Sequence, residues 1–195
     1  MNFGEWKAAV KSAMGREDVP DYVFTLAQDG INRDMRLLDM EAEAEIAVTG
    51  NTGSLPSDFG SPMRFVAHHS GTEFPLDAIM PTAIRKETGP GMPRHYAIGN
   101  GEVTVSPVPD QGYTFTLGYV KGLPSFSADS DTNAVIVRYP DLYLYLALSH
   151  AAVWAKDQEG ISTYDAAYKG AKHNAKQDDK RRRMGTKAGT RSARL

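Results

Sequence analysis

The chain has 195 residues, a formal net charge of −2 and no cysteine. This length suits one compact body, or two small lobes that share a core, and it excludes several large domains. The absence of cysteine excludes a disulfide framework and every thiolate zinc site. The first residues lack the basic start and apolar run of a secretory signal, and no stretch reaches the roughly 18 apolar residues of a membrane-spanning helix. We expect a soluble protein that is made and used without crossing a membrane.

The charge is unevenly distributed along the chain. Residues 171–195 contain nine lysines and arginines against two aspartates, so this end carries +7 and the remainder carries −9. Residues 184–195 contain almost no aliphatic side chain that could be buried. A segment of this composition stays disordered until a partner orders it. The pattern predicts an acidic body with an extended basic tail over residues 184–195.

Two amphipathic helices are expected at the N-terminus. Asn2 and Glu5 have the spacing of a capping box, which predicts a first helix over residues 2–14. Asp18 is placed to cap a second helix with Pro20 in its first turn. The apolar positions expected on the buried face of the second helix are Tyr22, Val23, Leu26, Ala27, Ile31 and Met35.

The pattern changes to short strands from about residue 39. Over residues 40–49 apolar side chains alternate mainly with glutamates, which is the period of a half-exposed strand with one acidic face. Several short apolar runs follow, each bounded by glycine or proline. A short helix is expected from Pro81 to Lys86.

Two hairpins are expected in the same region. Asn100 and Gly101 stand between apolar segments and suit a type I′ turn, which needs positive φ at both central residues. Residues 107–112 suit a second turn, which would pair residues 103–105 with residues 113–119. The sequence therefore predicts antiparallel β structure in the middle of the chain.

Helices return near the C-terminus. Asn133 can cap a short helical turn, and Pro140 can start a longer helix. Residues 142–155 are apolar on nearly all sides, so water cannot be the main neighbour of this helix. A last helix is expected from about Ile161, with Ser162 in a weak capping box.

These patterns predict an α+β fold in which N-terminal and C-terminal helices form a bundle and a central antiparallel β-sheet or sandwich is inserted between them. The expected domains are a helical bundle from residues 1–38 and 132–183, a β domain over residues 39–131, and the tail over residues 184–195.

No arrangement of residues typical of an active site is present. His68 and His69 would point to opposite faces of a strand and could not bind one ion together. Residues 129–133 match the first half of a calcium loop, but Ala134 and Pro140 occupy the required glycine and glutamate positions. The patterns of a nucleophile elbow and a phosphate-binding loop are also missing. We therefore predict no enzyme activity, no cofactor and no metal.

Two features exceed the needs of a self-sufficient domain. The helix over residues 142–155 is more apolar than one helical face requires, which indicates either burial in the monomer core or contact between subunits. The basic tail is either a solvated terminus, a segment that binds phosphates, or a segment that docks on a protein partner.

Several local strings resemble the head-to-tail adaptor proteins of tailed bacteriophages, especially those of short-tailed phages. Their order and spacing over about residues 20 to 170 carry the resemblance. The strings are Ile31-Asn-Arg-Asp-Met-Arg36 before the acidic strand, Leu55-Pro-Ser-Asp-Phe59, Tyr96-Ala-Ile-Gly-Asn-Gly-Glu-Val-Thr-Val-Ser-Pro107, and Tyr139-Pro-Asp-Leu-Tyr-Leu-Tyr-Leu-Ala-Leu148.

The resemblance implies a structural virion protein, made in the host cytoplasm, that forms a homo-oligomeric ring, usually of twelve copies. Such a ring lies beneath the portal protein and meets the tail nozzle or tail tube protein on its other side. Genomic DNA passes through the centre without sequence-specific binding. C-terminal segments of the family commonly reach the portal.

The expected functional residues follow from these roles. For binding to the portal they are Arg181, Arg182, Arg183, Lys187, Arg191 and Arg194. For contact between subunits they are Leu142, Tyr143, Tyr145, Leu146, Trp154, Tyr164 and Tyr168. An alternative function is a small DNA-binding structural protein whose basic tail grips phosphates. An enzyme of unrecognised type is a third and weaker alternative.

Overall fold

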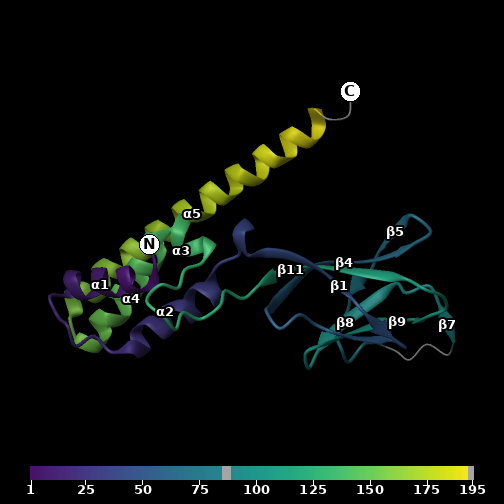
Figure 1. The fold of residues 1–195 in the computed structure, drawn as a ribbon, viewed down its shortest axis with the longest axis horizontal. Coiled ribbons are helices and arrows are strands. Elements are labelled where there is room, and N and C mark those ends of the chain that lie inside the picture. The colour runs from purple at the N-terminus through teal and green to yellow at the C-terminus, as the bar shows by residue number, and fades with distance from the viewer. Residues whose placement is uncertain (85–88, 193–195) are drawn as a thin grey trace. The chain divides into compact units, whose positions relative to one another are not determined.

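The computed structural model describes residues 1–84 and 89–192, with side chains up to residue 185. Its α+β fold confirms the prediction, with helices at both ends of the chain and mainly antiparallel sheets in the middle (Figure 1). The described chain divides into two compact units. The helical unit comprises residues 1–40 and 123–195, and the β unit comprises residues 41–122.

The first helix, α1 (Phe3–Met14), has the predicted capping box. The Asn2 side chain accepts a hydrogen bond from the Glu5 N–H at 2.8 Å, and the Glu5 carboxylate accepts one from the Asn2 N–H at 2.9 Å. Gly15 ends the helix with φ of 62°, in the left-handed region where glycine needs no steric compensation.

The second helix, α2 (Asp21–Asp34), begins later than predicted. Pro20 is its N-cap residue rather than part of the first turn, and no side chain caps the helix. Asp18 is not the cap because its carboxylate binds the Arg16 guanidinium in a bidentate pair, at 2.9 and 2.8 Å. The prediction of an Asp18 cap was therefore wrong.

The last three helices are α3 (Ala134–Arg138), α4 (Pro140–Ala155) and α5 (Gln158–Ser192). The predicted cap of α3 is confirmed, since Asn133 accepts hydrogen bonds from the N–H groups of the second and third helical residues. The last helix starts before Ile161, because the Asp157 side chain accepts a hydrogen bond from the Gly160 N–H at 3.0 Å.

The C-terminal helix also continues beyond its predicted end. The backbone is helical up to Ser192, so residues 184–192 are not extended as the composition predicted. The segment contains two glycines and two threonines, which are poor helix formers, but each residue added to an existing helix gains a hydrogen bond without a new nucleation step. Composition alone does not distinguish a helix from an extended segment.

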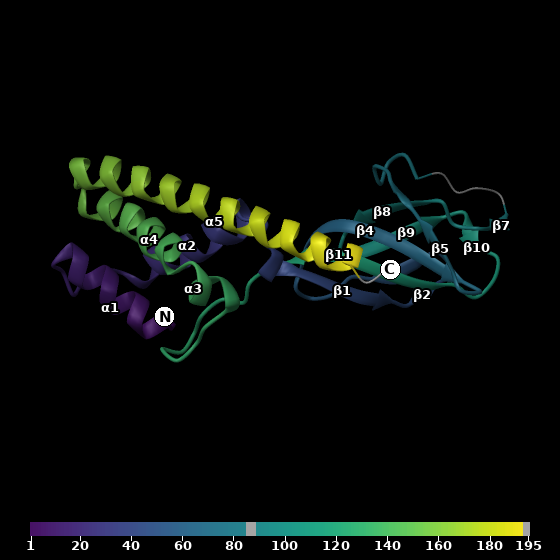
Figure 2. The same ribbon diagram turned by 90° about the horizontal axis from the view of Figure 1, so that it is seen from above.

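Helix α4 is the centre of the helical unit. Figure 2 shows it between α1 and α5, and it also packs against α2. Gly30 on α2 permits the close approach, because a Cβ at this position would lie 2.8 Å from the Leu146 side chain. An aromatic cluster fills the space beside α4, with ring centroids 5.2 to 6.3 Å apart; its members are Phe3, Trp6, Phe24, Phe126 and Tyr143.

The β unit contains two larger sheets and one short parallel strand pair. The four-stranded sheet has the order β1-β11-β4-β5, the five-stranded sheet has the order β2-β3-β9-β8-β6, and β7 pairs with β10. The strands are β1 (Glu41–Ile46), β2 (Val48–Thr49), β3 (Thr52–Ser54), β4 (Phe59–His69), β5 (Thr72–Pro75), β6 (Asp77–Ala78), β7 (Pro90–Gly91), β8 (His95–Gly99), β9 (Glu102–Ser106), β10 (Val108–Pro109) and β11 (Thr114–Lys121).

One hydrophobic core joins the two larger sheets. Its buried members come from both sheets and include Phe65, Tyr96, Val103, Phe115 and Leu117. The alanines of β1 pack against this core, and the intervening glutamates do not belong to it. The predicted two-residue alternation of this strand is therefore confirmed.

The first predicted hairpin is confirmed and the second is wrong. Asn100 and Gly101 have φ values of 54° and 78° and join β8 to β9. Strand β9 already pairs with β3 on its other edge, so it has no edge left for β11. Residues 107–112 instead cross from one sheet to the other. Residues 81–84 form a turn rather than the predicted helix, and Lys86 lies outside the described residues.

Candidate interaction surfaces

The described arginines of the predicted portal site lie in the C-terminal half of α5, where the Asp39 carboxylate binds two guanidinium groups. Arg182 binds Asp39 in a bidentate pair, with N–O distances of 2.6 and 3.0 Å. Arg138 Nε lies 3.3 Å from the same carboxylate. We call Asp39, Arg138 and Arg182 the Asp39 cluster. It ties α5 to residues that are distant in the sequence.

The electrostatics of the Asp39 cluster favour the charged forms. The hydrogen bond from Arg182 is the main reason that the pKa of Asp39 lies below its usual range, and the charge of Arg138 adds to this effect. The pKa of Arg182 is raised in turn, chiefly by its hydrogen bond to Asp39. The Asp39 side chain is only 14% exposed, so solvent screens the interaction less than it screens a surface pair.

A second contact lies beside the Asp39 cluster. The buried carboxylate of Asp179 accepts a hydrogen bond from the Leu38 N–H at 2.7 Å and one from Arg183 Nε at 2.6 Å. Tyr139 donates a hydrogen bond to Asp178 at 2.8 Å. The bonds from Leu38 and Tyr139 fix this part of α5 to the segments before β1 and α4, whereas the bond from Arg183 lies within α5.

The predicted portal-binding residues therefore differ in their surroundings. Arg182 and Arg183 bind carboxylates of the same chain, whereas Arg181 is exposed. Lys187 and Arg191 lie on the helical backbone, but their side chains lie outside the described residues. Arg194 also lies outside the described residues.

Three of the predicted subunit-contact residues belong to the monomer core. Leu142, Tyr143 and Tyr168 are buried in the helical unit, so their assignment to a subunit interface is corrected. Burial raises the pKa of Tyr143 to about 12, and its hydroxyl accepts a hydrogen bond from Asn133 Nδ2 at 3.0 Å. Burial is also the main reason that the pKa of Tyr168 is raised.

The other four predicted subunit-contact residues are half-buried. They are Tyr145, Leu146, Trp154 and Tyr164. The Trp154 ring lies beneath the Arg16 guanidinium at 4.5 Å, so part of its surface is covered within the chain. The all-round apolar character of α4 is thus explained mainly by its central place in the bundle.

The structure exposes two apolar residues that the sequence placed on a buried face. Tyr22 is 52% exposed and Leu26 is 46% exposed. The buried stripe of α2 is narrower than predicted and passes through Val23, Ala27 and Ile31. The apolar residues of α2 cover a wider part of the helix than one packing contact requires. This excess is the sequence signal that could have revealed the exposed surface at Tyr22 and Leu26.

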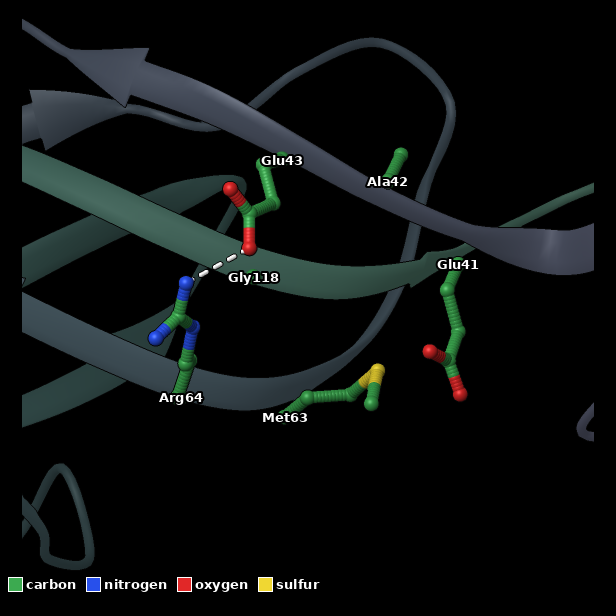
Figure 3. Close-up of a pocket in the computed structure, with 6 residues that line it drawn as sticks. All are labelled: Glu41, Ala42, Glu43, Met63, Arg64 and Gly118. Atoms are coloured by element: carbon green, nitrogen blue, oxygen red, sulfur yellow. Dashed lines mark hydrogen bonds and ion pairs between the residues drawn. The ribbon is translucent and has the colours of Figure 1, made fainter. Parts of the chain in front are cut away.

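A hollow of about 340 Å³ lies on the four-stranded sheet. Figure 3 shows the six residues that line it. Glu43 on β1 and Arg64 on β4 point toward one another across Gly118 on β11, with an N–O distance of 2.6 Å. A Cβ at Gly118 would lie 2.9 Å from Arg64 Cγ, so glycine leaves room for this ion pair. The hollow is also lined by Met63, which is exposed.

The two adjacent histidines have separate partners. His68 Nε2 lies 3.1 Å from the Thr116 hydroxyl, and His69 Nδ1 lies 3.0 Å from the Gly112 carbonyl oxygen. Among residues 1–84 and 89–192, no group of three or more histidine or acidic side chains is placed to hold a metal ion. Within the same ranges, no helix has the length and apolar character needed to span a membrane.

The comparisons with known proteins identify the class of this chain. A family model described as SU10 adaptor protein matches residues 1–192, which is nearly the whole chain. The protein therefore belongs to the SU10 adaptor protein family, a family of phage head-to-tail adaptors, and the predicted resemblance is confirmed at this level. None of the curated proteins matches the chain. The short-tailed type remains a prediction.

Proposed function

We propose that copies of this chain form a ring, of twelve copies, that joins the portal protein of a phage capsid to its tail nozzle or tail tube. Genomic DNA passes through the central channel without sequence-specific binding. The match of the adaptor family over residues 1–192 is the observation that carries this proposal. The excess negative charge of residues 1–170 supports it, because like charge disfavours adhesion of the DNA phosphates. Adaptors are structural virion proteins, so no catalytic step is proposed.

The C-terminal end is the proposed contact with the portal. Arg181 and the basic residues after it, Lys187, Arg191 and Arg194, would bind an acidic groove on the portal through charge-assisted hydrogen bonds. Arg182 would act differently, because its bond to Asp39 anchors α5 to the helical unit. Arg183 would support this anchor from within α5, because it binds Asp179, which also accepts the Leu38 N–H. Such an anchor would hold the start of the basic segment at a defined place on the helical unit.

A binding experiment with assembled portal protein from the same phage tests this proposal. The chain is compared with a variant that lacks residues 184–195, at about 0.15 M salt. We expect the deletion to preserve the helical circular dichroism of the remaining chain and to weaken portal binding. An Arg94→Glu variant is the matched control, because Arg94 is an exposed cation of the β unit. Equal affinity of the deletion variant and the full chain for the portal would refute the assignment.

A second candidate function is favoured by the charge of +7 on residues 171–195. Such a segment can bind duplex DNA through its phosphates, with an affinity that falls steeply with salt. Fluorescence anisotropy with a labelled duplex separates the two functions. The adaptor proposal expects no binding at about 0.15 M salt, whereas tight binding with a steep salt dependence would favour the DNA-binding function.

A further inference from the structure

The first relevant surface is an exposed apolar patch on α2. Tyr22 and Leu26 are each about half exposed and lie one helical turn apart, so their side chains are neighbours. The exposed carboxylates of Asp21 and Asp29 lie on the same part of the helix, and residues 21–32 contain no lysine or arginine. We call Asp21, Tyr22, Leu26 and Asp29 the α2 face. It combines apolar surface with negative charge.

The solvent side of α5 has the opposite charge. Lys169, Lys176 and Lys180 are exposed and recur at intervals of seven and four residues, so they line one side of the helix. Asp178 and Asp179 are directed away from this side, because their carboxylates accept hydrogen bonds from Tyr139 and Leu38, which pack against α5. The lysines therefore form a basic row.

A glycine without a packing role lies beside this basic row. Gly170 is exposed in the interior of α5, and a Cβ at this position would meet no neighbouring atom within 4 Å. Glycine destabilises a helix interior relative to alanine, and the described chain shows no close approach here that would require it. Ala166, one turn earlier, is also exposed. We call Ala166, Gly170 and the three lysines the α5 face; its small residues leave room for a large side chain from another molecule.

We propose that the α2 face of one copy docks on the α5 face of a second copy of this chain. Tyr22 and Leu26 would cover the notch at Gly170, and the carboxylates of the α2 face would lie against the lysine row. The surface ion pair between Lys169 and Asp165, at 2.6 Å, is weak enough to exchange partners. The two faces carry opposite charge, and the small residues of the α5 face leave room for the large side chains of the α2 face. These two properties favour the α5 face of a second copy as the partner of the exposed patch.

The proposed contact joins two different surfaces, so it is heterologous. A heterologous contact repeated from copy to copy builds a ring when the rotation closes. Both faces belong to the helical unit, so the contact does not depend on the placement of the β unit. This inference rests on the proposal that the chain forms a ring, and it assigns the surfaces through which the ring would close.

Cysteine cross-linking tests the contact cleanly because the chain has no cysteine of its own. A variant with Leu26→Cys and Gly170→Cys is treated with a bis-maleimide at high protein concentration, and the products are separated on a denaturing gel. A heterologous contact predicts a ladder that continues beyond the dimer. Each single variant should stay monomeric, because one cysteine has no partner across such a contact. A variant with Leu26→Cys and Ser12→Cys is the control, since Ser12 is exposed on α1.

Charge reversal provides a second test that does not depend on the register of the two helices. K176E/K180E should lower the association constant by about tenfold, and D21K/D29K should lower it similarly, because attraction becomes repulsion. Mixing the two variants should restore association at the reversed faces. A purely structural effect of either substitution would not be rescued in this way.

The outcomes separate this inference from the proposed function. A ladder in the double-cysteine variant, together with mutual rescue by the charge variants, supports the contact. Absence of the ladder overturns it. Sedimentation velocity of the same samples then decides whether the chain forms a ring at all. Oligomers without the ladder would mean that the ring closes through another interface. Monomers alone, also in the presence of assembled portal, would contradict the ring as well.

Discussion

The Asp39 cluster makes the sharpest prediction about stability. Asp39→Asn keeps the shape of the side chain but removes its charge, so Arg138 and Arg182 lose their shared counter-ion. A hydrogen bond to a charged group contributes about 1.5–3 kcal/mol, and an exposed ion pair contributes about 1 kcal/mol or less. Because Asp39 is mostly buried and Arg182 is 25% exposed, we expect destabilisation of the helical unit by about 2 kcal/mol.

Tryptophan fluorescence during urea unfolding measures this effect. Both tryptophans of the chain, Trp6 and Trp154, lie in the helical unit, so the signal reports on that unit alone. A loss of about 2 kcal/mol corresponds to a fall in melting temperature of about 4–8 °C for a chain of this size. Asp18→Asn is the matched control, since it removes an equally well-formed but exposed pair with Arg16 and should change stability much less. An Asp39→Asn variant as stable as the natural chain at neutral pH would refute the reasoning.

The same ion pair predicts a pH dependence with a defined sign. The folded-state pKa of Asp39 lies below the ordinary aspartate value, mainly because of the bond from Arg182. Its stabilisation is therefore complete above the ordinary value near pH 4 and is lost as the pH falls through the lower folded-state pKa. The difference in unfolding free energy between the natural chain and Asp39→Asn should shrink over that acidic range. A difference that stays constant there would contradict the assignment.

Three further predictions concern single residues. Asn133→Ala should lower the unfolding free energy of the helical unit by about 2 kcal/mol, because α3 loses its cap and Tyr143 loses its donor; urea unfolding followed by fluorescence checks this. Gly118→Val should disrupt the four-stranded sheet by displacing Arg64, and should lower the melting temperature of the β unit in calorimetry, whereas Thr72→Val, at an exposed position of β5 in the same sheet, should be tolerated. The difference between the ultraviolet titrations of the natural chain and Tyr143→Phe should show that Tyr143 ionises only near pH 12, and a Tyr143 signal near pH 10 in the folded chain would contradict its burial.

Local signals in the sequence located most helices. The capping residues Asn2 and Asn133 act on backbone groups only two or three positions away, so their spacing is sufficient to predict them. The turn at Asn100 and Gly101 is local in the same sense. The predicted alternation of apolar and acidic residues along β1 is also present in the structure, because one face of the strand packs against the core.

Features that depend on distant partners could not be predicted. Asp39 and Arg182 are 143 positions apart. The residues next to them in the sequence do not indicate that the two form a largely buried pair. The second hairpin failed for a related reason, since the turn residues of 107–112 do not reveal that β3 already occupies the free edge of β9. The subunit assignment of Tyr143 failed because an apolar helix can be covered by its own chain or by another copy, and composition does not distinguish these cases.

Electron microscopy of particles assembled without this chain tests most directly whether it joins the phage head to the tail. The gene is interrupted in the phage that encodes the chain, and the particles are purified with and without the intact protein supplied in trans. We expect capsids without attached tails in the absence of the chain and tailed particles after complementation. Tailed, infectious particles that lack the chain would contradict the account.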